Sequence, residues 1–300
     1  MRKATLLAVA ALAALATTPA SATQWGSYHW ANDGTGLKLD IHHTFRNGDW
    51  TDWYNEAVSD WGDTSKTRIT LTDKGAYTGT TPKRCDPIAG AALACSDTYG
   101  YRGWLGVATI WANGDHITQA TTKLNDSYYS SPTYNTPGWR DLVACQEIGH
   151  DFGLDHQDET FDNYNKGTCM DYTNAPDGGL VGGFNYGPAN RSPNSGDYAS
   201  LTSDAMYGAG HNDSGGGGGG CNPRSPKCSG GQTDAFTFRE IGKSVSSAAA
   251  SDSGQWGQAI AFDRSGRPDT FMLDLGNGRR KLTHVFWVPG YRPIPDNFHD

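Results

Sequence analysis

One short segment of the chain combines residue types that can bind a metal ion and move a proton. It runs Cys145-Gln146-Glu147-Ile148-Gly149-His150-Asp151-Phe152-Gly153-Leu154-Asp155-His156. On a helix, Gln146 and His150 share one face, so both side chains can reach the same ion. Glu147 is offset by about 100° and lies at the edge of that face, within reach of a water on the ion. Gly153 lets the chain leave the helix sharply, which turns His156 back towards the ion.

This spacing resembles the metzincin signature H-E-x-x-H-x-x-G-x-x-H, with Gln146 in place of the first histidine. Further along, Cys169-Met170-Asp171-Tyr172 resembles the Met-turn, in which a methionine lies beneath the metal-binding histidines. A tyrosine two residues after the methionine, here Tyr172, also resembles the astacin and serralysin turns. The resemblance covers residues 23–213. It implies an α+β catalytic domain of two subdomains, with a twisted mixed sheet and an active-site helix, then the Met-turn and a C-terminal helix.

The activity that the resemblance implies is zinc-dependent cleavage of a protein or peptide substrate. Gln146, His150 and His156 would hold the ion, Glu147 would act as general base, and Tyr172 would bind the ion or donate a hydrogen bond to the developing oxyanion. We expect an extended substrate to pair with the edge of the strand expected at Trp104–Ala112 or at Ile117–Leu124.

The glutamine leaves an alternative open. An amide oxygen is a poorer zinc ligand than an imidazole nitrogen, so the ion could be another transition metal. Gametolysin-like peptidases of the same clan include members with Q-E-x-x-H, which favours an active enzyme. The alternative is a catalytically inactive binding or adhesion protein on a metzincin fold.

The first 22 residues have the pattern of a secretory signal peptide. Arg2 and Lys3 precede an apolar stretch, and Ala20-Ser21-Ala22 supplies the small residues of a cleavage site. A secreted protein favours disulfides among its six cysteines. Sequential pairing is the interpretation we prefer, and a bond between Cys145 and Cys169 would fasten the metal-binding helix to the Met-turn. The expected pairs are Cys85–Cys95, Cys145–Cys169 and Cys221–Cys228.

A glycine-rich linker is expected at residues 214–231, because Gly215 to Gly220 are six consecutive glycines. Residues 232–300 are predicted to form a small β-rich accessory module. Its clearest feature is a hairpin, with Asp269–Leu275 and Arg279–Val288 flanking Gly276-Asn277-Gly278. This module could bind a surface or polysaccharide through Trp256 or Trp287, although tryptophan rings are more often part of a core.

The remaining secondary structure predicted for residues 23–213 alternates between strands and helices. Periodicity favours helices at Asp49–Trp61, Trp139–Phe152 and Tyr198–Tyr207. It favours strands at Leu37–Thr44, Arg68–Thr72, Trp104–Ala112 and, as an edge strand, Ile117–Leu124.

Several classes of protein are disfavoured by composition. With 24 basic and 32 acidic residues and a net charge of −8, the chain lacks the basic face of a nucleic-acid binder. No apolar run reaches the roughly 18 residues of a membrane span. The Gly-x-Ser-x-Gly motif of serine hydrolases is absent from the sequence.

Two other groups of polar residues were interpreted as structural or solvent-exposed. The acidic residues at 151, 155, 158, 159 and 162 are interpreted as solvated; they could bind calcium, although the full calcium-loop motif is missing. His42, His43 and His116 have no partner at ligand spacing, and we interpret them as structural or exposed.

Overall fold

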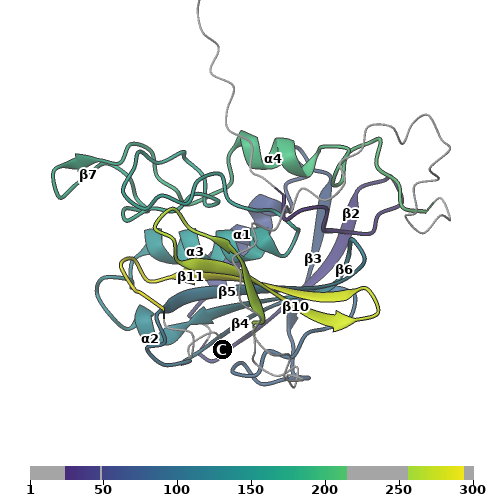
Figure 1. The fold of residues 1–300 in the computed structure, drawn as a ribbon, viewed down its shortest axis with the longest axis horizontal. Coiled ribbons are helices and arrows are strands. Elements are labelled where there is room, and N and C mark those ends of the chain that lie inside the picture. Colours follow the sequence, from purple (N-terminus) through teal and green to yellow (C-terminus); the bar gives the residue numbers. More distant parts are fainter. Residues whose placement is uncertain (1–23, 48, 215–255, 294–300) are drawn as a thin grey trace, which may run out of the picture.

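The computed structural model describes residues 24–47, 49–214 and 256–293, and its largest element is one mixed β-sheet (Figure 1). The strands lie in the order β3-β2-β4-β6-β5-β11-β10-β9, and the short β1 pairs with β6 off this path. β2, β3, β4 and β6 run parallel to one another, whereas β5 is antiparallel to β6. The strand bounds are β1 His29–Trp30, β2 Leu37–Phe45, β3 Ile69–Ala76, β4 Ala91–Asp97, β5 Trp104–Asn113, β6 His116–Asn125, β9 Gln258–Phe262, β10 Pro268–Gly276 and β11 Arg279–Trp287.

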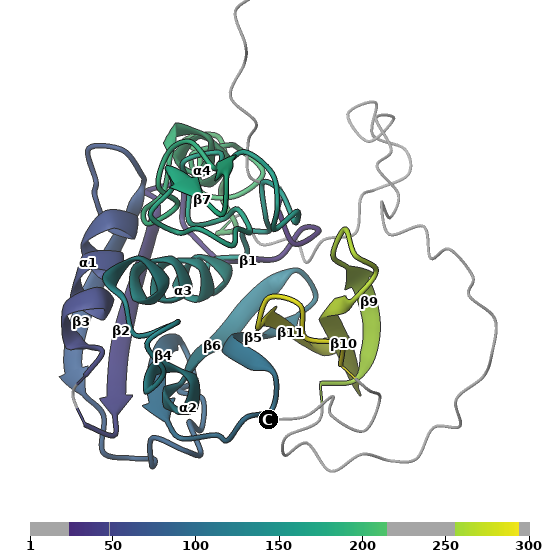
Figure 2. The ribbon, with the colours of Figure 1, turned by 90° about the vertical axis from the view of Figure 1, so that its left-hand side faces the viewer.

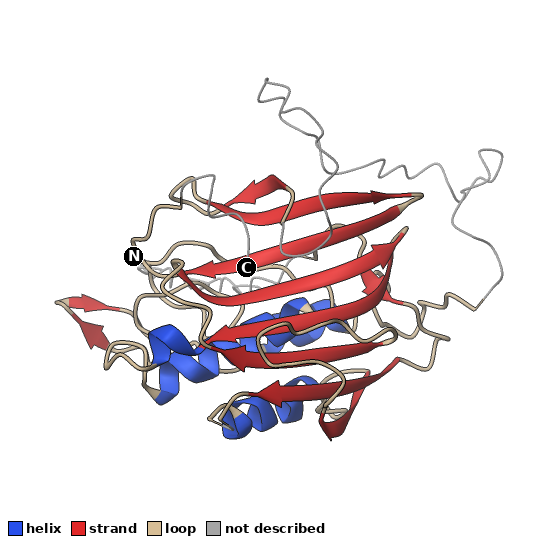
Figure 3. Ribbon diagram, turned by 90° about the horizontal axis from the view of Figure 1, so that it is seen from below, coloured by secondary structure: helices blue, strands red, loops and turns tan. Residues whose placement is uncertain are grey.

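Two helices, α1 (Thr51–Trp61) and α3 (Pro137–His150), pack on one face of this sheet (Figure 3). α3 begins after Thr136, whose side chain accepts a hydrogen bond from the backbone N–H of Trp139, and Pro137 occupies the first helical turn. All but the first of its residues are buried, so α3 is the central helix of the core. Smaller elements complete the described chain: α2 Asp126–Tyr129, β7 Leu180–Val181, β8 Phe184–Asn185 and α4 Ser195–Leu201.

The fold agrees with the predicted α+β class at the level of a large mixed sheet with few helices. The predicted helices correspond to α1, α3 and α4, although α4 ends at Leu201 and turns follow it. β4 was not predicted, because its sequence AALACSD lacks the branched residues that mark strands. β6 was expected at an edge, but it lies between β4 and β5.

The C-terminal strands do not stand apart from the rest of the sheet. We expected residues 232–300 to form a separate accessory module. In the described part, 256–293, β11 pairs along the whole of β5, from Arg279 opposite Asn113 to Trp287 opposite Trp104. β10 and β9 continue the same sheet (Figure 2). Trp256 and Trp287 are buried side by side, so neither ring is available at the surface.

Two of the three expected disulfides are present, Cys85–Cys95 and Cys145–Cys169. The third pair, Cys221–Cys228, lies outside the described residues, as does the expected signal peptide. Among the described helices, none has the length and apolar character needed to cross a bilayer.

Candidate metal centre

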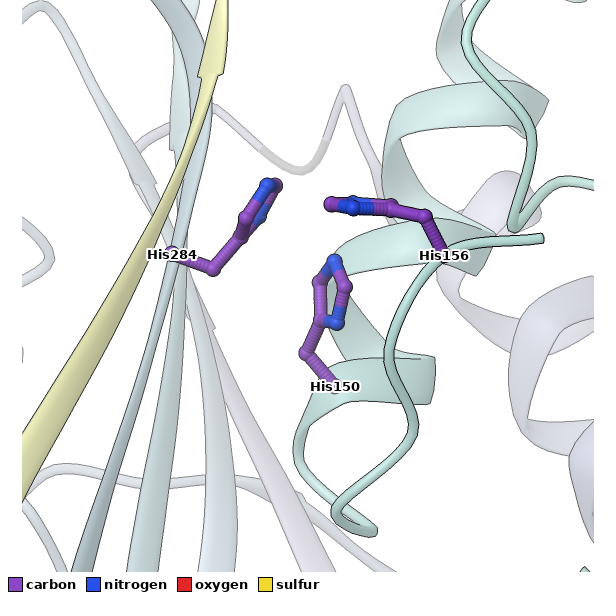
Figure 4. Close-up of side chains that lie close together, drawn as sticks. All are labelled: His150, His156 and His284. Atoms are coloured by element: carbon purple, nitrogen blue, oxygen red, sulfur yellow. The ribbon is translucent and has the colours of Figure 1, made fainter. Parts of the chain in front are cut away.

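Three histidine side chains from separate parts of the chain converge between α3 and the sheet (Figure 4). His150 is the last residue of α3, His156 lies in the loop that follows, and His284 comes from β11. Their ring centroids are 4.1 to 4.8 Å apart, and one ligand atom from each lies within 4.8 Å of the other two. His150 and His284 are fully buried, and His156 is 4% exposed. Three imidazole rings that converge in this way form a ligand set well suited to zinc or a similar transition metal.

His150 is held in the tautomer that a metal ligand requires. Its Nδ1 lies 2.8 Å from the carbonyl oxygen of Leu154, which only accepts, so Nδ1 carries the hydrogen. Its Nε2 is therefore a bare lone pair, and no described residue donates to it. The ring also stacks on Trp25, with centroids 4.9 Å apart and planes 8° from parallel. These contacts are the outer-shell support that orients metal-binding histidines.

His156 is flanked on its Nδ1 side by two carboxylates. Nδ1 lies 3.5 Å from an oxygen of Asp155 and 3.5 Å from an oxygen of Glu159. Burial opposes protonation of this ring, but the hydrogen bond to Glu159 and the two negative charges outweigh it and raise the pKa of His156. Asp155 and Glu159 thus orient His156. Calcium binding by the acidic residues at 151–162 stays a prediction.

His284 lies between Glu147, the general-base candidate, and Tyr172. Its Nδ1 is 3.5 Å from Oε2 of Glu147, and its Nε2 is 2.8 Å from the hydroxyl of Tyr172. The Tyr172 hydroxyl also lies 3.2 Å from a carboxylate oxygen of Asp269 on β10. Burial, and then the neighbouring His150, lower the pKa of His284, which favours the neutral ring that binds metals.

Glu147 is fully buried beside this cluster, and its Oε1 has no hydrogen-bond partner in the described chain. Space for it comes from Gly106 on β5, where a Cβ atom would lie 2.7 Å from Cγ of Glu147. Burial, and then the charge of Asp151, raise the pKa of Glu147 well above its usual value. Carboxyl groups with a strongly raised pKa are typical of functional sites. A cation bound nearby would lower the pKa of Glu147 again and favour its ionised form, which can accept a proton.

Gln146 lies in α3, four positions before His150. Its Nε2 donates a 2.7 Å hydrogen bond to the carbonyl oxygen of Cys169, which fixes the amide. Its Oε1 is buried and has no partner among the residues that the structure covers. The ligand role expected for Gln146 therefore stays a prediction, and the oxygen that this role needs is available.

The residues around the end of α3 explain why two glycines stand there. At Gly149, a Cβ would lie 2.7 Å from Sδ of Met170, so Met170 packs directly against the helix next to His150. Gly153 has φ +88°, and a Cβ there would lie 2.1 Å from the carbonyl oxygen of Tyr28. The Cys145–Cys169 disulfide also joins α3 to the segment that contains Met170.

The residues of the candidate metal centre offer nitrogen and oxygen atoms that could bind a divalent cation. Nε2 of His150, Oε1 of Gln146 and Oε1 of Glu147 are buried polar atoms without hydrogen-bond partners in the described part of the chain. Such atoms are costly to bury unless a ligand satisfies them. The expected residues Gln146, Glu147, His150, His156, Met170 and Tyr172 all lie in this region.

His284 is the site residue that the sequence did not suggest. Its segment, Arg279–Trp287, is recognisable only as a hairpin strand, and nothing local connects His284 to α3. A comparison of the chain with protein-family models gives no match, and neither does a comparison with curated protein sequences.

Proposed function

We propose that this protein is a secreted, metal-dependent endopeptidase of the metzincin type. The observation that carries the proposal is the position of Glu147, a buried carboxyl with an unpartnered oxygen, directly beside three converging imidazoles. When bound there, a divalent ion such as zinc would polarise the scissile carbonyl and lower the pKa of the attacking water.

The protein's own side chains supply the proton transfers. Glu147 takes the proton of the attacking water and later delivers it to the leaving amine. The Tyr172 hydroxyl, within 2.8 Å of His284 and 3.2 Å of Asp269, is the donor nearest to the cluster for stabilising negative charge on the substrate oxygen. Both side chains are fully buried in the described arrangement.

The described arrangement is a closed form of the enzyme. An extended peptide adds to an exposed strand edge by main-chain hydrogen bonds, and β5 was one of the two strands expected to bind substrate in this way. That edge is covered by β11, which places His284 opposite Ala108. All the proposed catalytic residues and ligands are at most 4% exposed, so a substrate can reach them only if this arrangement opens. We propose that β11 leaves β5 to open it.

Displacement of β11 changes the ligand set. In the closed form, His150, His156 and His284 would hold the ion. With β11 displaced, His284 would no longer be available, and Oε1 of Gln146, four positions before His150 in α3, would be the further ligand. This exchange gives separate roles to the glutamine in the Q-E-x-x-H motif and to the histidine on β11.

A second candidate function is a catalytically inactive, metal-binding protein. The complete burial of the site and the integration of β11 into the sheet favour it. In that case the closed form is the only folded form, and His284 is a permanent ligand.

The two candidates are separated by cutting the zinc-loaded full chain at a specific protease site inserted within Gly215–Gly220, and then assaying casein hydrolysis with and without chelator. Chelator-sensitive hydrolysis after the cut supports the peptidase. A cut protein that keeps both its zinc and its C-terminal strands and cleaves nothing supports the inactive scaffold.

A further inference from the structure

A second cluster of metal-ligating side chains lies away from α3. It joins His29 on β1 with His211 and Asp213, which follow α4 near the end of the second described segment. One ligand atom from each of these residues lies within 4.8 Å of the other two. His116, at the start of β6, reaches the same carboxylate. The three histidines and one aspartate come from three segments that are distant in sequence.

The distances within this cluster match those around a single ion. Nε2 of His211 is 3.0 Å from Nε2 of His29 and 3.1 Å from Oδ2 of Asp213. Nε2 of His29 is 3.5 Å from the same Oδ2, and Nε2 of His116 is 3.2 Å from Oδ1. Ligand atoms about 2.0–2.1 Å from a tetrahedral zinc ion lie about 3.3 Å from one another.

Hydrogen bonds on the far side of two rings fix the tautomers. Nδ1 of His29 is 2.7 Å from the carbonyl oxygen of Ser27, and Nδ1 of His211 is 2.9 Å from that of Asp204. Carbonyl oxygens only accept, so both Nδ1 atoms carry hydrogen and both Nε2 atoms are lone pairs in the neutral rings. Two lone pairs 3.0 Å apart, beside a carboxylate, repel one another unless a cation lies between them.

The carboxylate is also held in place. Oδ2 of Asp213 accepts a 2.9 Å hydrogen bond from the backbone N–H of Asn32, and the N–H of Asp213 donates to the Asn32 carbonyl at 2.8 Å. Three of the candidate ligands are therefore oriented by backbone groups, which is how outer-shell contacts prepare a metal site.

We propose that His29, His211 and Asp213, with His116 as the fourth ligand, form a structural zinc site distinct from the centre on α3. Four protein ligands leave no open position, which is the pattern of structural rather than catalytic zinc. The His116 side chain is 46% exposed, so its ring can turn towards the ion with little hindrance.

The position of the site indicates what the ion stabilises. Residues just before and after His29 pack around the end of α3: Trp25 stacks on His150, and Trp30 Nε1 donates to the carbonyl of Asp151 at 2.8 Å. The ion would fasten this segment both to β6 and to the residues that precede Gly215–Gly220. It thereby holds Trp25 against a ligand of the first centre while adding no group to the chemistry.

The test uses the full chain carrying His150→Ala and His156→Ala, so that the first centre does not contribute and the outcome is independent of peptidase activity. In this background we expect one zinc per chain by elemental analysis, and a Tm that falls on addition of chelator. Adding His211→Ala, or the milder Asp213→Asn, should remove that zinc and the chelator effect. Adding His42→Ala, a partly buried histidine of β2 outside both clusters, should change neither.

Two results would overturn the proposal. One is a background protein that is folded but contains no zinc after incubation with the metal, in which case a shared proton joins His29 and His211. The other is a His211→Ala or Asp213→Asn protein that retains the full equivalent. If the alanine variant fails to fold, the asparagine variant, which keeps the size of the side chain, decides between these outcomes.

Discussion

Glu147 on α3 and His284 on β11 lie with Oε2 and Nδ1 3.5 Å apart, although 137 positions separate them in the sequence. The contact joins the general-base candidate to a strand that was expected to belong to an accessory module. It makes β11 part of the candidate metal centre.

The substitution Glu147→Gln removes the proton acceptor and keeps the size of the side chain. We expect hydrolysis by the cut protein to fall by about 10²- to 10⁴-fold, because general-base catalysis typically contributes that much. Zinc content and Tm should stay unchanged, since Glu147 is not among the proposed ligands. Glu56→Gln, on the exposed side of α1, is the matched control and should keep full activity. Equal rates for the two variants would rule out Glu147 as the base.

Substitutions of Gln146 and of His284 should affect zinc binding in opposite ways before and after the cut. With Gln146→Ala, the uncut protein should keep the zinc of the α3 centre on three histidines, whereas the cut protein should lose both that zinc and its activity. With His284→Ala, the uncut protein should bind zinc at this centre more weakly, and the cut protein should remain active. Asp213→Asn in both backgrounds removes the contribution of the proposed structural site. Titration with a zinc-binding dye before and after the cut measures both effects. Loss of zinc from the cut and uncut His284→Ala proteins alike would instead make His284 a permanent ligand.

Gly153→Ala tests the close approach that turns His156 back to the site. Gly153 and Gly100 both have φ +88°, but only at Gly153 would a Cβ meet a backbone atom, the carbonyl oxygen of Tyr28 at 2.1 Å. Gly100→Ala should cost about 1 kcal/mol of unfolding free energy from backbone conformation alone. Gly153→Ala should cost about 2 kcal/mol or more beyond that, because the Tyr28 segment must shift. Denaturant unfolding of both variants measures the difference, and equal losses would remove the packing argument.

Replacing Cys145 and Cys169 together by alanine opens a bridge that spans 24 positions. Loop-closure entropy predicts a loss of about 3 kcal/mol of unfolding free energy, and less for the Cys85–Cys95 pair, which spans 10. The first replacement should also weaken zinc binding, because it frees the Met170 turn from α3. The second should leave zinc binding unchanged. An equal effect of the two replacements on zinc affinity would show that the first bond does not position the site.

Local sequence patterns predicted many residues of the candidate metal centre but not the pairing of distant strands. The spacing of Glu147, His150 and His156 was informative because a helix and one glycine turn determine how those residues meet. The hairpin was also predictable from local sequence, because Gly276-Asn277-Gly278 favours a tight turn. Asn277 adopts a positive φ of 54° there. Pairing of β11 with β5 depends on edges brought together only in the folded sheet, so His284 could not be placed. The cluster of His29, His211 and Asp213 could not be predicted for the same reason, and His116, which we interpreted as structural or exposed, lies beside its carboxylate.

We propose that β11 covers a working peptidase site. The covalent connection through residues 215–255 keeps the C-terminal strands at a high effective concentration, and a cut lowers this to the concentration of the sample. The most direct measurement is therefore the hydrolysis rate of a quenched fluorescent peptide by one zinc-loaded sample, before and after cleavage within Gly215–Gly220. Our account predicts a low rate that rises after the cut as the strands dissociate, and that chelator abolishes. Complete dissociation of the strands with zinc retained and no rise in rate would contradict it.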